Sequence, residues 1–67
     1  MILVHLADGF EEVEAVTVTD ILRRAGLETK FVSVTGSRQI KGAHGITVEA
    51  DTMFEEADYE ACDMIVL

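Results

Sequence analysis

The fold is decided by the first sixteen residues, MILVHLADGFEEVEAV (residues 1–16). Residues 1–7 form an almost continuous apolar run that ends at Asp8 and Gly9, which is typical of a buried strand followed by a turn. Because the run does not alternate with polar residues, it favours a strand covered on both faces, as in a parallel sheet. The acidic residues that follow indicate the start of a helix.

We expect this helix to span residues 10–25. Asp8 suits the N-cap position because Glu11 stands three residues later, as in a capping box. Two arginines in the last turn complement the helix dipole, and Gly26 suits the position just after the helix. The β-branched run at residues 16–19 lowers helix propensity and makes a strand the alternative there. The signals at both ends favour the helix.

The remaining residues predict short strands and one further turn of helix. The predicted segments are a strand at 29–34, a hairpin with strands near 39–41 and 46–49, a short helical turn at 54–58 and a strand at 63–67. Strands that alternate with helices predict an α/β fold with a doubly wound parallel sheet. The last strand is almost entirely apolar, so we expect it to be central in that sheet.

A central strand at the end of the chain leaves one flank of the sheet unbuilt. We therefore expect residues 1–67 to be the N-terminal segment of a single larger α/β domain, with the remainder in a separate or cleaved chain or lost from this one. The alternative is a free-standing small domain, which at this length ordinarily needs a disulfide, a metal or a partner.

Composition argues against several classes of protein. Thirteen acidic residues against five basic ones give a net charge of −8, which argues against a nucleic-acid-binding surface. No signal-peptide pattern is present, and no apolar run approaches the roughly 20 residues of a membrane span. A single cysteine, Cys62, excludes an internal disulfide, and His5 and His44 are too far apart to suggest a zinc motif. We expect a cytoplasmic chain without a metal site.

The three glutamates at the start of the helix differ in the direction that a helix would give them. At about 100° per residue, one apolar arc includes Val13 and Leu22, and Glu14 falls near its middle. Glu11 is expected to be the cap partner and Glu12 a surface charge, whereas Glu14 is directed towards the sheet.

A carboxylate on the sheet-facing side is costly to bury and calls for a reason. Glu14 would lie above the carboxyl end of the first strand, the edge at which doubly wound sheets bind ligands. If protonated, it could donate a hydrogen bond to a neighbouring thiolate or substrate oxygen. The alternatives are a side chain that reaches solvent or one that pairs with a basic residue, although no basic residue is conveniently placed on that arc.

Residues 2–26, ILVHLADGFEEVEAVTVTDILRRAG, resemble the opening of the ThiJ/PfpI superfamily, in the branch of the parkinsonism-associated protein deglycase and its bacterial relatives. That family begins with a strand, a G-x-E-E-x-E segment and a helix that ends in R-A-G. The match continues to YEACDMIVL, residues 59–67, which resembles the strand before the family's P-G-G turn. The resemblance covers essentially the whole chain and implies a flavodoxin-like, three-layer α/β/α domain.

By this resemblance, Glu14 matches the family glutamate that contacts the reactive cysteine of a strand-to-helix nucleophile elbow. It would be protonated and donate a hydrogen bond to the sulfur, which favours the thiolate and stabilises an oxidised sulfinate. That cysteine, the histidine near it and the P-G-G turn belong to later segments of the family and are not in this chain. Cys62 precedes the last strand, so it is expected to be a structural or peripheral thiol.

The resemblance also implies a homodimer through the first helix, with Val16, Asp20 and Arg24 near the interface. Arg24 and His44 match positions that can line an anion pocket close to the active site, and His44 replaces what is often a basic residue. His5 lies within the first strand and is expected to pack in the sheet.

For the complete domain, the resemblance implies cysteine-dependent, cofactor-free chemistry on small reactive carbonyl compounds. The reaction would be glyoxalase-type conversion of methylglyoxal to lactate, or deglycation of early glycation adducts. One alternative is a redox-sensing or chaperone-like protein whose cysteine is oxidised; others are an intracellular peptidase or amidase and an inert binding module. The expected partners are the complementary C-terminal segment, a second copy and the carbonyl substrate, with neither nucleic acid nor membrane.

Overall fold

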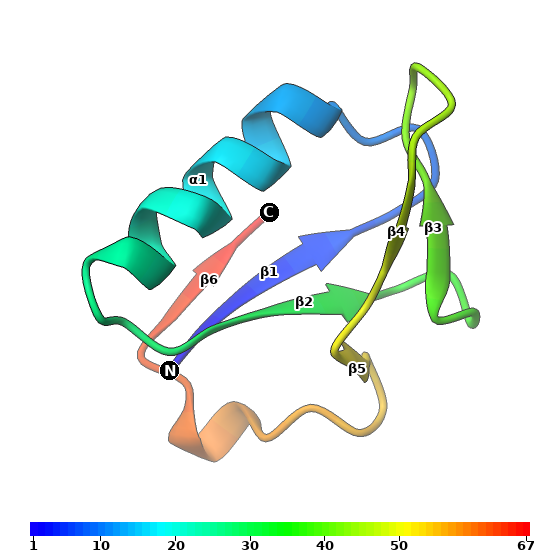
Figure 1. Cartoon of the computed structure of the whole chain (residues 1–67). Coiled ribbons are helices and arrows are strands. Elements are labelled where there is room, and N and C mark those ends of the chain that lie inside the picture. The colour runs from blue at the N-terminus through cyan, green and yellow to red at the C-terminus, as the bar shows by residue number, and fades with distance from the viewer.

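The computed structural model describes all 67 residues and contains a four-stranded parallel sheet with one helix packed on it (Figure 1). The helix is α1 (Glu12–Arg24). The sheet order is β5-β2-β1-β6, with β1 at Ile2–Leu6, β2 at Thr29–Ser33, β5 at Thr52–Met53 and β6 at Met64–Val66. A separate antiparallel hairpin pairs β3 (Gln39–Lys41) with β4 (Thr47–Glu49), and a 3-10 helix at Tyr59–Ala61 precedes β6. The α/β class with a parallel sheet, as predicted from the sequence, is confirmed.

β1 forms the centre of the sheet and of the core. It pairs in parallel with β2, where Ile2 lies opposite Thr29, and with β6, where Ile2 lies opposite Met64. Alternate side chains of β1 point towards α1 and join the hydrophobic cluster, which consists of Ile2, Val4, Leu6, Phe31, Ile40 and Ala50. Ile40 comes from the hairpin, so the hairpin also contributes to the core.

The side of α1 that packs on the sheet differs from the predicted one. Thr19 is buried and Ala15 and Leu22 pack against the core, whereas Val13 is 78% exposed. Glu14 therefore stands at the margin of the packed side, roughly 100° around the axis from its centre, and not at the middle of a buried arc. The helical projection indicated the wrong side because the outer side of α1 also carries apolar residues, among them Val13 and Ile21.

The start of α1 also differs from the prediction, whereas its end agrees. The N-cap residue is Glu11 and makes no side-chain cap bond. Asp8 lies too far before the first turn to cap it, and its carboxylate instead accepts the Lys41 N–H at 3.0 Å. At the other end, Gly26 takes the left-handed conformation (φ 83°), and the Leu27 N–H bonds to the Leu22 carbonyl. This is the glycine-dependent C-terminal motif expected there.

The Asp51 carboxylate connects the last turn of α1 to β2. Asp51 accepts the Phe31 N–H at 2.8 Å and an Arg23 N–H at 3.1 Å, while the Arg23 Nε donates to the Thr29 carbonyl. The Arg23 guanidinium also lies over the Phe31 ring. These contacts hold the last turn of α1 over β2.

β6 occupies the edge of the sheet in this chain. It pairs with β1 on one side only, and Met64 and Ile65 are about half exposed. The apolar character that predicted a central strand is therefore present, but no neighbour covers its outer side. The helical turn expected at 54–58 is a non-helical turn at 54–56, and the 3-10 helix follows it.

The longest helix, α1, has 13 residues. No helix of the structure combines the length and apolar character needed to cross a membrane.

Candidate functional site

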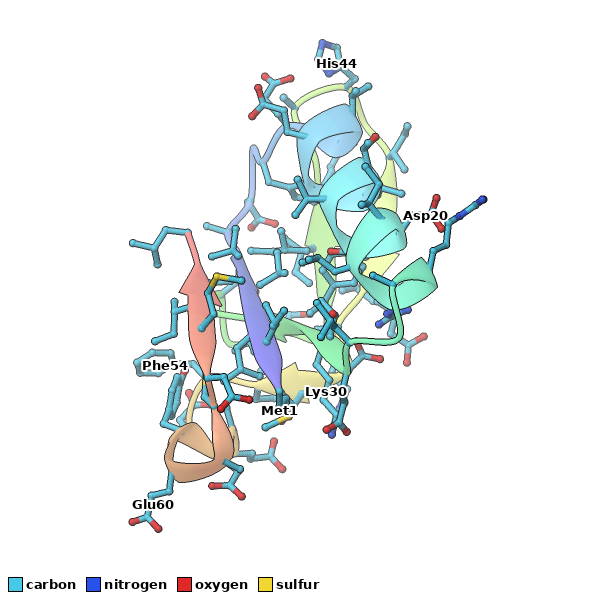
Figure 2. All side chains as sticks on the ribbon, turned by 90° about the vertical axis from the view of Figure 1, so that its left-hand side faces the viewer. Met1, Asp20, Lys30, His44, Phe54 and Glu60 are labelled. Carbon is cyan, nitrogen blue, oxygen red and sulfur yellow. The ribbon has the colours of Figure 1, made fainter.

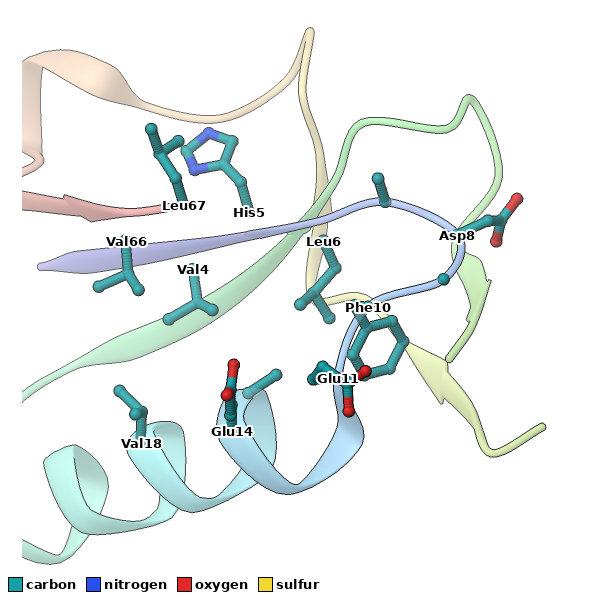
Figure 3. Close-up of a pocket in the computed structure, with 13 residues that line it drawn as sticks. Val4, His5, Leu6, Asp8, Phe10, Glu11, Glu14, Val18, Val66 and Leu67 are labelled. Atoms are coloured by element: carbon teal, nitrogen blue, oxygen red, sulfur yellow. The ribbon is translucent and has the colours of Figure 1, made fainter. Parts of the chain in front are cut away.

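A cavity of about 500 Å³ lies at the carboxyl ends of β1 and β6, between these strands and the first turns of α1 (Figure 3). It is lined by Val4, His5, Leu6, Ala7, Asp8, Gly9, Phe10, Glu11, Glu14, Ala15, Val18, Val66 and Leu67. Most of these side chains are apolar, and the carboxylates lie towards the start of α1. This is the edge of a parallel sheet at which ligands bind, and the sequence predicted that Glu14 would lie above it.

Glu14 is the catalytic candidate predicted from the sequence, and the structure places it in the wall of this cavity. Figure 3 shows its carboxyl group rising from α1 towards the strands, between the positions of Val4 and Leu6. The side chain is exposed in this chain and makes no hydrogen bond or ion pair within it. A carboxyl group that faces the sheet without a partner is available to a group brought in from outside the chain.

The turn between β1 and α1 gives the cavity its shape. Gly9 has φ 88°, a left-handed conformation that side-chain-bearing residues rarely adopt. This turn lets the chain reverse directly after β1, so that Phe10 and Glu11 return over the strand end. The glycine is therefore needed for the conformation of the segment that lines the cavity.

Glu12, predicted to be a solvated charge, is only 5% exposed. Its Oε2 accepts the His44 N–H at 2.8 Å and the Ile46 N–H at 3.2 Å. Its Oε1 lies 2.9 Å from the His44 Nδ1. The prediction for Glu12 was wrong because its partners stand more than thirty residues later, in the turn of the hairpin, where no helical projection can place them.

The Glu12–His44 pair changes the charge behaviour of both groups. Burial opposes the charged form of Glu12, but the His44 hydrogen bond and the backbone N–H groups of Glu12, Ile46 and His44 outweigh it and lower the Glu12 pKa to about 2. The hydrogen bond to Glu12, aided by the charges of Glu12 and Glu11, raises the pKa of His44. Glu12 is thus a buried carboxylate, and its contact with His44 favours the charged form of the imidazole.

One atom each of Glu11, Glu12 and His44 lies within 4.8 Å of the others, which is a spacing that a metal ion can bridge. Both Glu12 oxygens are already used, however, one by the imidazole and one by two backbone N–H groups. We therefore assign this cluster a role in holding the hairpin.

Arg24 and His44, predicted to belong to an anion pocket, lie at opposite ends of α1 in this chain. Arg24 donates to the Asp20 carboxylate at 3.1 Å in the last turns of the helix, and His44 contacts Glu12 in the first turn. Neither lines the cavity. Their role in an anion pocket stays a prediction.

A second, apolar cavity of about 420 Å³ lies on the other face of the sheet, lined by His5, Ala7, Val34, Phe54, Tyr59, Ile65 and Leu67. His5 stacks on Tyr59 and its Nε2 lies 2.8 Å from the Tyr59 hydroxyl. Figure 2 shows Phe54 on this side of the sheet. His5 is therefore a histidine packed on the sheet, as predicted. Cys62 stands before the amino end of β6, at the opposite end from Glu14, and lines neither cavity.

Comparison with known proteins agrees with this architecture. The model of the DJ-1/PfpI family matches residues 1–67. Protein DJ-1 homolog B of Arabidopsis thaliana is 36% identical over 66 residues, which are 98% of this chain and 15% of that protein. A protein of Thermococcus kodakarensis named a deglycase is 35% identical over 66 residues, again 98% of this chain and 39% of that protein.

Solved structures of relatives have the same fold over this segment. A cysteine-to-alanine mutant of a DJ-1 superfamily protein from Salmonella typhimurium superposes with a TM-score of 0.92 at 36% identity, covering 98% of this chain and 36% of that one. Oxidised Toxoplasma gondii DJ-1 superposes with a TM-score of 0.90 at 38% identity, covering 96% of this chain and 35% of that one. The chain thus corresponds to little more than a third of these solved proteins.

Proposed function

Because this chain belongs to the DJ-1/PfpI family, we propose that it supplies one half of a cysteine-dependent site for small reactive carbonyl compounds. The observation that carries the proposal is the unpartnered Glu14 in the wall of the cavity at the carboxyl ends of β1 and β6. The Thermococcus relative named a deglycase supports the class of substrate. In this proposal residues 1–67 are the N-terminal segment of a single domain, and the complementary segment brings the cysteine and a histidine.

The reaction we propose is the conversion of methylglyoxal and water to lactate without a cofactor. The thiolate adds to the aldehyde carbon and forms a hemithioacetal. Glu14, with the histidine of the complementary segment, moves a proton from that carbon to the neighbouring carbonyl carbon, which gives a thioester. Water then cleaves the thioester, releasing lactate and the thiolate. The chain's own contribution is the carboxyl group and the apolar wall around it.

A redox role is the second candidate, since a solved relative is an oxidised form. A protonated Glu14 that donates a hydrogen bond to sulfur stabilises a thiolate and a sulfinate alike. The same carboxyl group would then protect an oxidised cysteine and take no part in turnover. Deglycation of glycation adducts and peptidase or amidase activity are further alternatives for the complete protein.

We also propose that two copies form a homodimer through α1. The dimer would cover the exposed outer side of this helix, which includes Val13, Val16 and Ile21. Arg24 and His44 are candidates for an anion pocket; because they lie at opposite ends of α1, they would act separately or from two copies. We also propose a cytoplasmic location, where thiols stay reduced.

The test is turnover of methylglyoxal by the complete protein and its Glu14→Gln variant. Loss of the proton relay is expected to lower kcat by about 10²–10⁴-fold. Glu49→Gln, an exposed carboxylate on β4, is the matched control and should keep full activity. Unchanged turnover in Glu14→Gln would overturn the relay, and a peroxide-dependent mass shift of the cysteine without turnover would favour the redox role.

A further inference from the structure

The β3–β4 hairpin stands outside the parallel sheet and is attached to the segment between β1 and α1. The Gly9 N–H donates to the Lys41 carbonyl at 2.8 Å, and the Ala43 N–H donates to the Phe10 carbonyl at 2.8 Å. The Asp8 carboxylate accepts the Lys41 N–H at 3.0 Å. Asp8, Gly9 and Phe10 line the cavity, so these three bonds connect the hairpin to the cavity wall.

Glu12 adds the only buried charged side chain to this attachment. As described above, it binds two backbone N–H groups and the imidazole of the hairpin turn. The turn fits closely around it: a Cβ at Gly42 would overlap the Glu12 carboxyl group. Figure 2 shows His44 at the tip of this turn, beyond the first turn of α1.

We propose that Glu12 is a positioning residue for the candidate site: by holding the hairpin turn at residues 42–46, it fixes the segment at residues 8–11 and the first turn of α1, and so fixes where Glu14 stands. Glu12 lies outside the cavity lining, so it acts through these elements and not on a substrate. Its effect on catalysis rests on the proposed function, whereas its effect on the segment at residues 8–11 does not.

The charges around Glu12 make this attachment dependent on protonation of His44. His44 faces Glu12 at 2.9 Å and Glu11 at 3.9 Å. Asp8 and Lys41 also join the hairpin to the segment before α1, but their bond uses the Lys41 backbone N–H and not its charged side chain. A neutral His44 would keep a hydrogen bond with Glu12 but lose the ion pair.

Amide hydrogen exchange on the complete protein tests the proposal without a turnover assay. In Glu12→Ala, the amides of His44 and Ile46 lose their acceptor and should exchange at least about tenfold faster. The Gly9 amide, which bonds to Lys41 and lines the cavity, should also exchange faster, because the hairpin holds it. Glu55→Gln should leave all three amides unchanged, since Glu55 is exposed in the turn after β5 and bonds to none of them.

The outcomes separate the alternatives. If only the His44 and Ile46 amides change while Gly9 stays protected, Glu12 is a local contact and the proposal is overturned. If Glu12→Ala unfolds the protein, the isosteric Glu12→Gln takes its place: it keeps one oxygen for the backbone N–H groups but no charge for His44. In Glu12→Gln, the exchange protection of the Gly9 amide should stay constant between pH 6 and 9, whereas in the parent protein it should fall over this range. Equal pH profiles of the two proteins would overturn the proposal.

The effect of Glu12 on catalysis is measured separately, by steady-state kinetics. In a complete protein that turns over methylglyoxal, Glu12→Ala should lower kcat by about tenfold or more with a smaller change in KM, and Glu12→Gln should restore part of kcat at high pH. An unchanged kcat together with a mobile Gly9 would overturn the link between Glu12 and Glu14. A parent protein without turnover would defeat the proposed function, and the exchange experiment would still decide the role of Glu12.

Discussion

At the scale of single residues, the Glu12 carboxyl group occupies the space that a side chain at Gly42 would need. Gly42 does not have the positive φ of the chain's other four glycines, so its need for glycine comes from the neighbouring carboxyl group and not from the backbone. We expect Gly42→Ala to lower the free energy of unfolding by about 1–3 kcal/mol through overpacking. Chemical denaturation of the complete protein measures this change.

A double-mutant cycle identifies Glu12 as the cause. Gly42→Ala introduced into a Glu12→Ala background should cost clearly less than in the parent protein, because the overlapping carboxyl group is gone. Equal costs in the two backgrounds would show that the methyl group meets something other than Glu12.

Thr19 presents a second residue-scale prediction. It is 3% exposed, and its hydroxyl has no hydrogen-bond partner. Thr19→Val removes an unsatisfied hydroxyl at constant shape and should raise the free energy of unfolding by about 1 kcal/mol. Thr17→Val, on the exposed side of the same helix, is the control and should change stability little. A destabilised Thr19→Val would mean that the hydroxyl has a partner.

At the scale of elements, the attachment of the hairpin should depend on pH. The pKa of His44 is raised, so its contribution is complete below the ordinary value of 6.5 and is lost as pH rises through the raised value. The pKa of Glu12 is lowered, so its contribution is complete above 4.5 and is lost as pH falls towards about 2. Exchange protection of the Ile46 amide should therefore be greatest between pH 4.5 and 6.5. Protection that increases steadily from pH 6 to 9 would contradict this assignment.

The elements were largely predictable from the sequence because their signals are local. The apolar run of β1, the glycine after α1 and the short strands of the hairpin are all read from neighbouring residues. The side of α1 that meets the sheet was not predictable in this way. Its outer side carries Val13, Val16 and Ile21, so only the tertiary contacts of Ala15, Thr19 and Leu22 identify the packed side.

The same distinction applies to the candidate site. Glu14 was chosen by its helical projection and by its place above the carboxyl end of the first strand, where parallel sheets bind ligands. The projection was wrong about the buried side, whereas the place at the strand end agrees with the cavity, and the role of Glu14 stays a prediction. Glu12 could not be found from the sequence, because its partners His44 and Ile46 come from a hairpin whose docking depends on the fold of the whole chain. The spacing of sequence motifs carries no information about such a contact.

At the scale of the whole molecule, we propose that the complementary segment packs against the open edge at β6. Ile65 is 50% exposed there. Ile65→Lys should leave the fold of this chain intact but should prevent its association with a separately expressed complementary segment, since a charge would be buried without a partner. Co-purification measures the association. Ile46→Lys, at an isoleucine of similar exposure in the hairpin turn, is the control; equal association of both variants would contradict the assignment of β6.

The central claim is that the carboxyl group of Glu14 is one half of a site whose other half is a cysteine of the complementary segment. A crystal structure of the complete protein measures this directly, as the distance between the Glu14 carboxyl oxygen and the sulfur of that cysteine. We predict a hydrogen bond of about 3 Å, with Glu14 still in the wall of the cavity described above. A Glu14 side chain turned to solvent, or a cysteine beyond the reach of any hydrogen bond to it, would contradict the account.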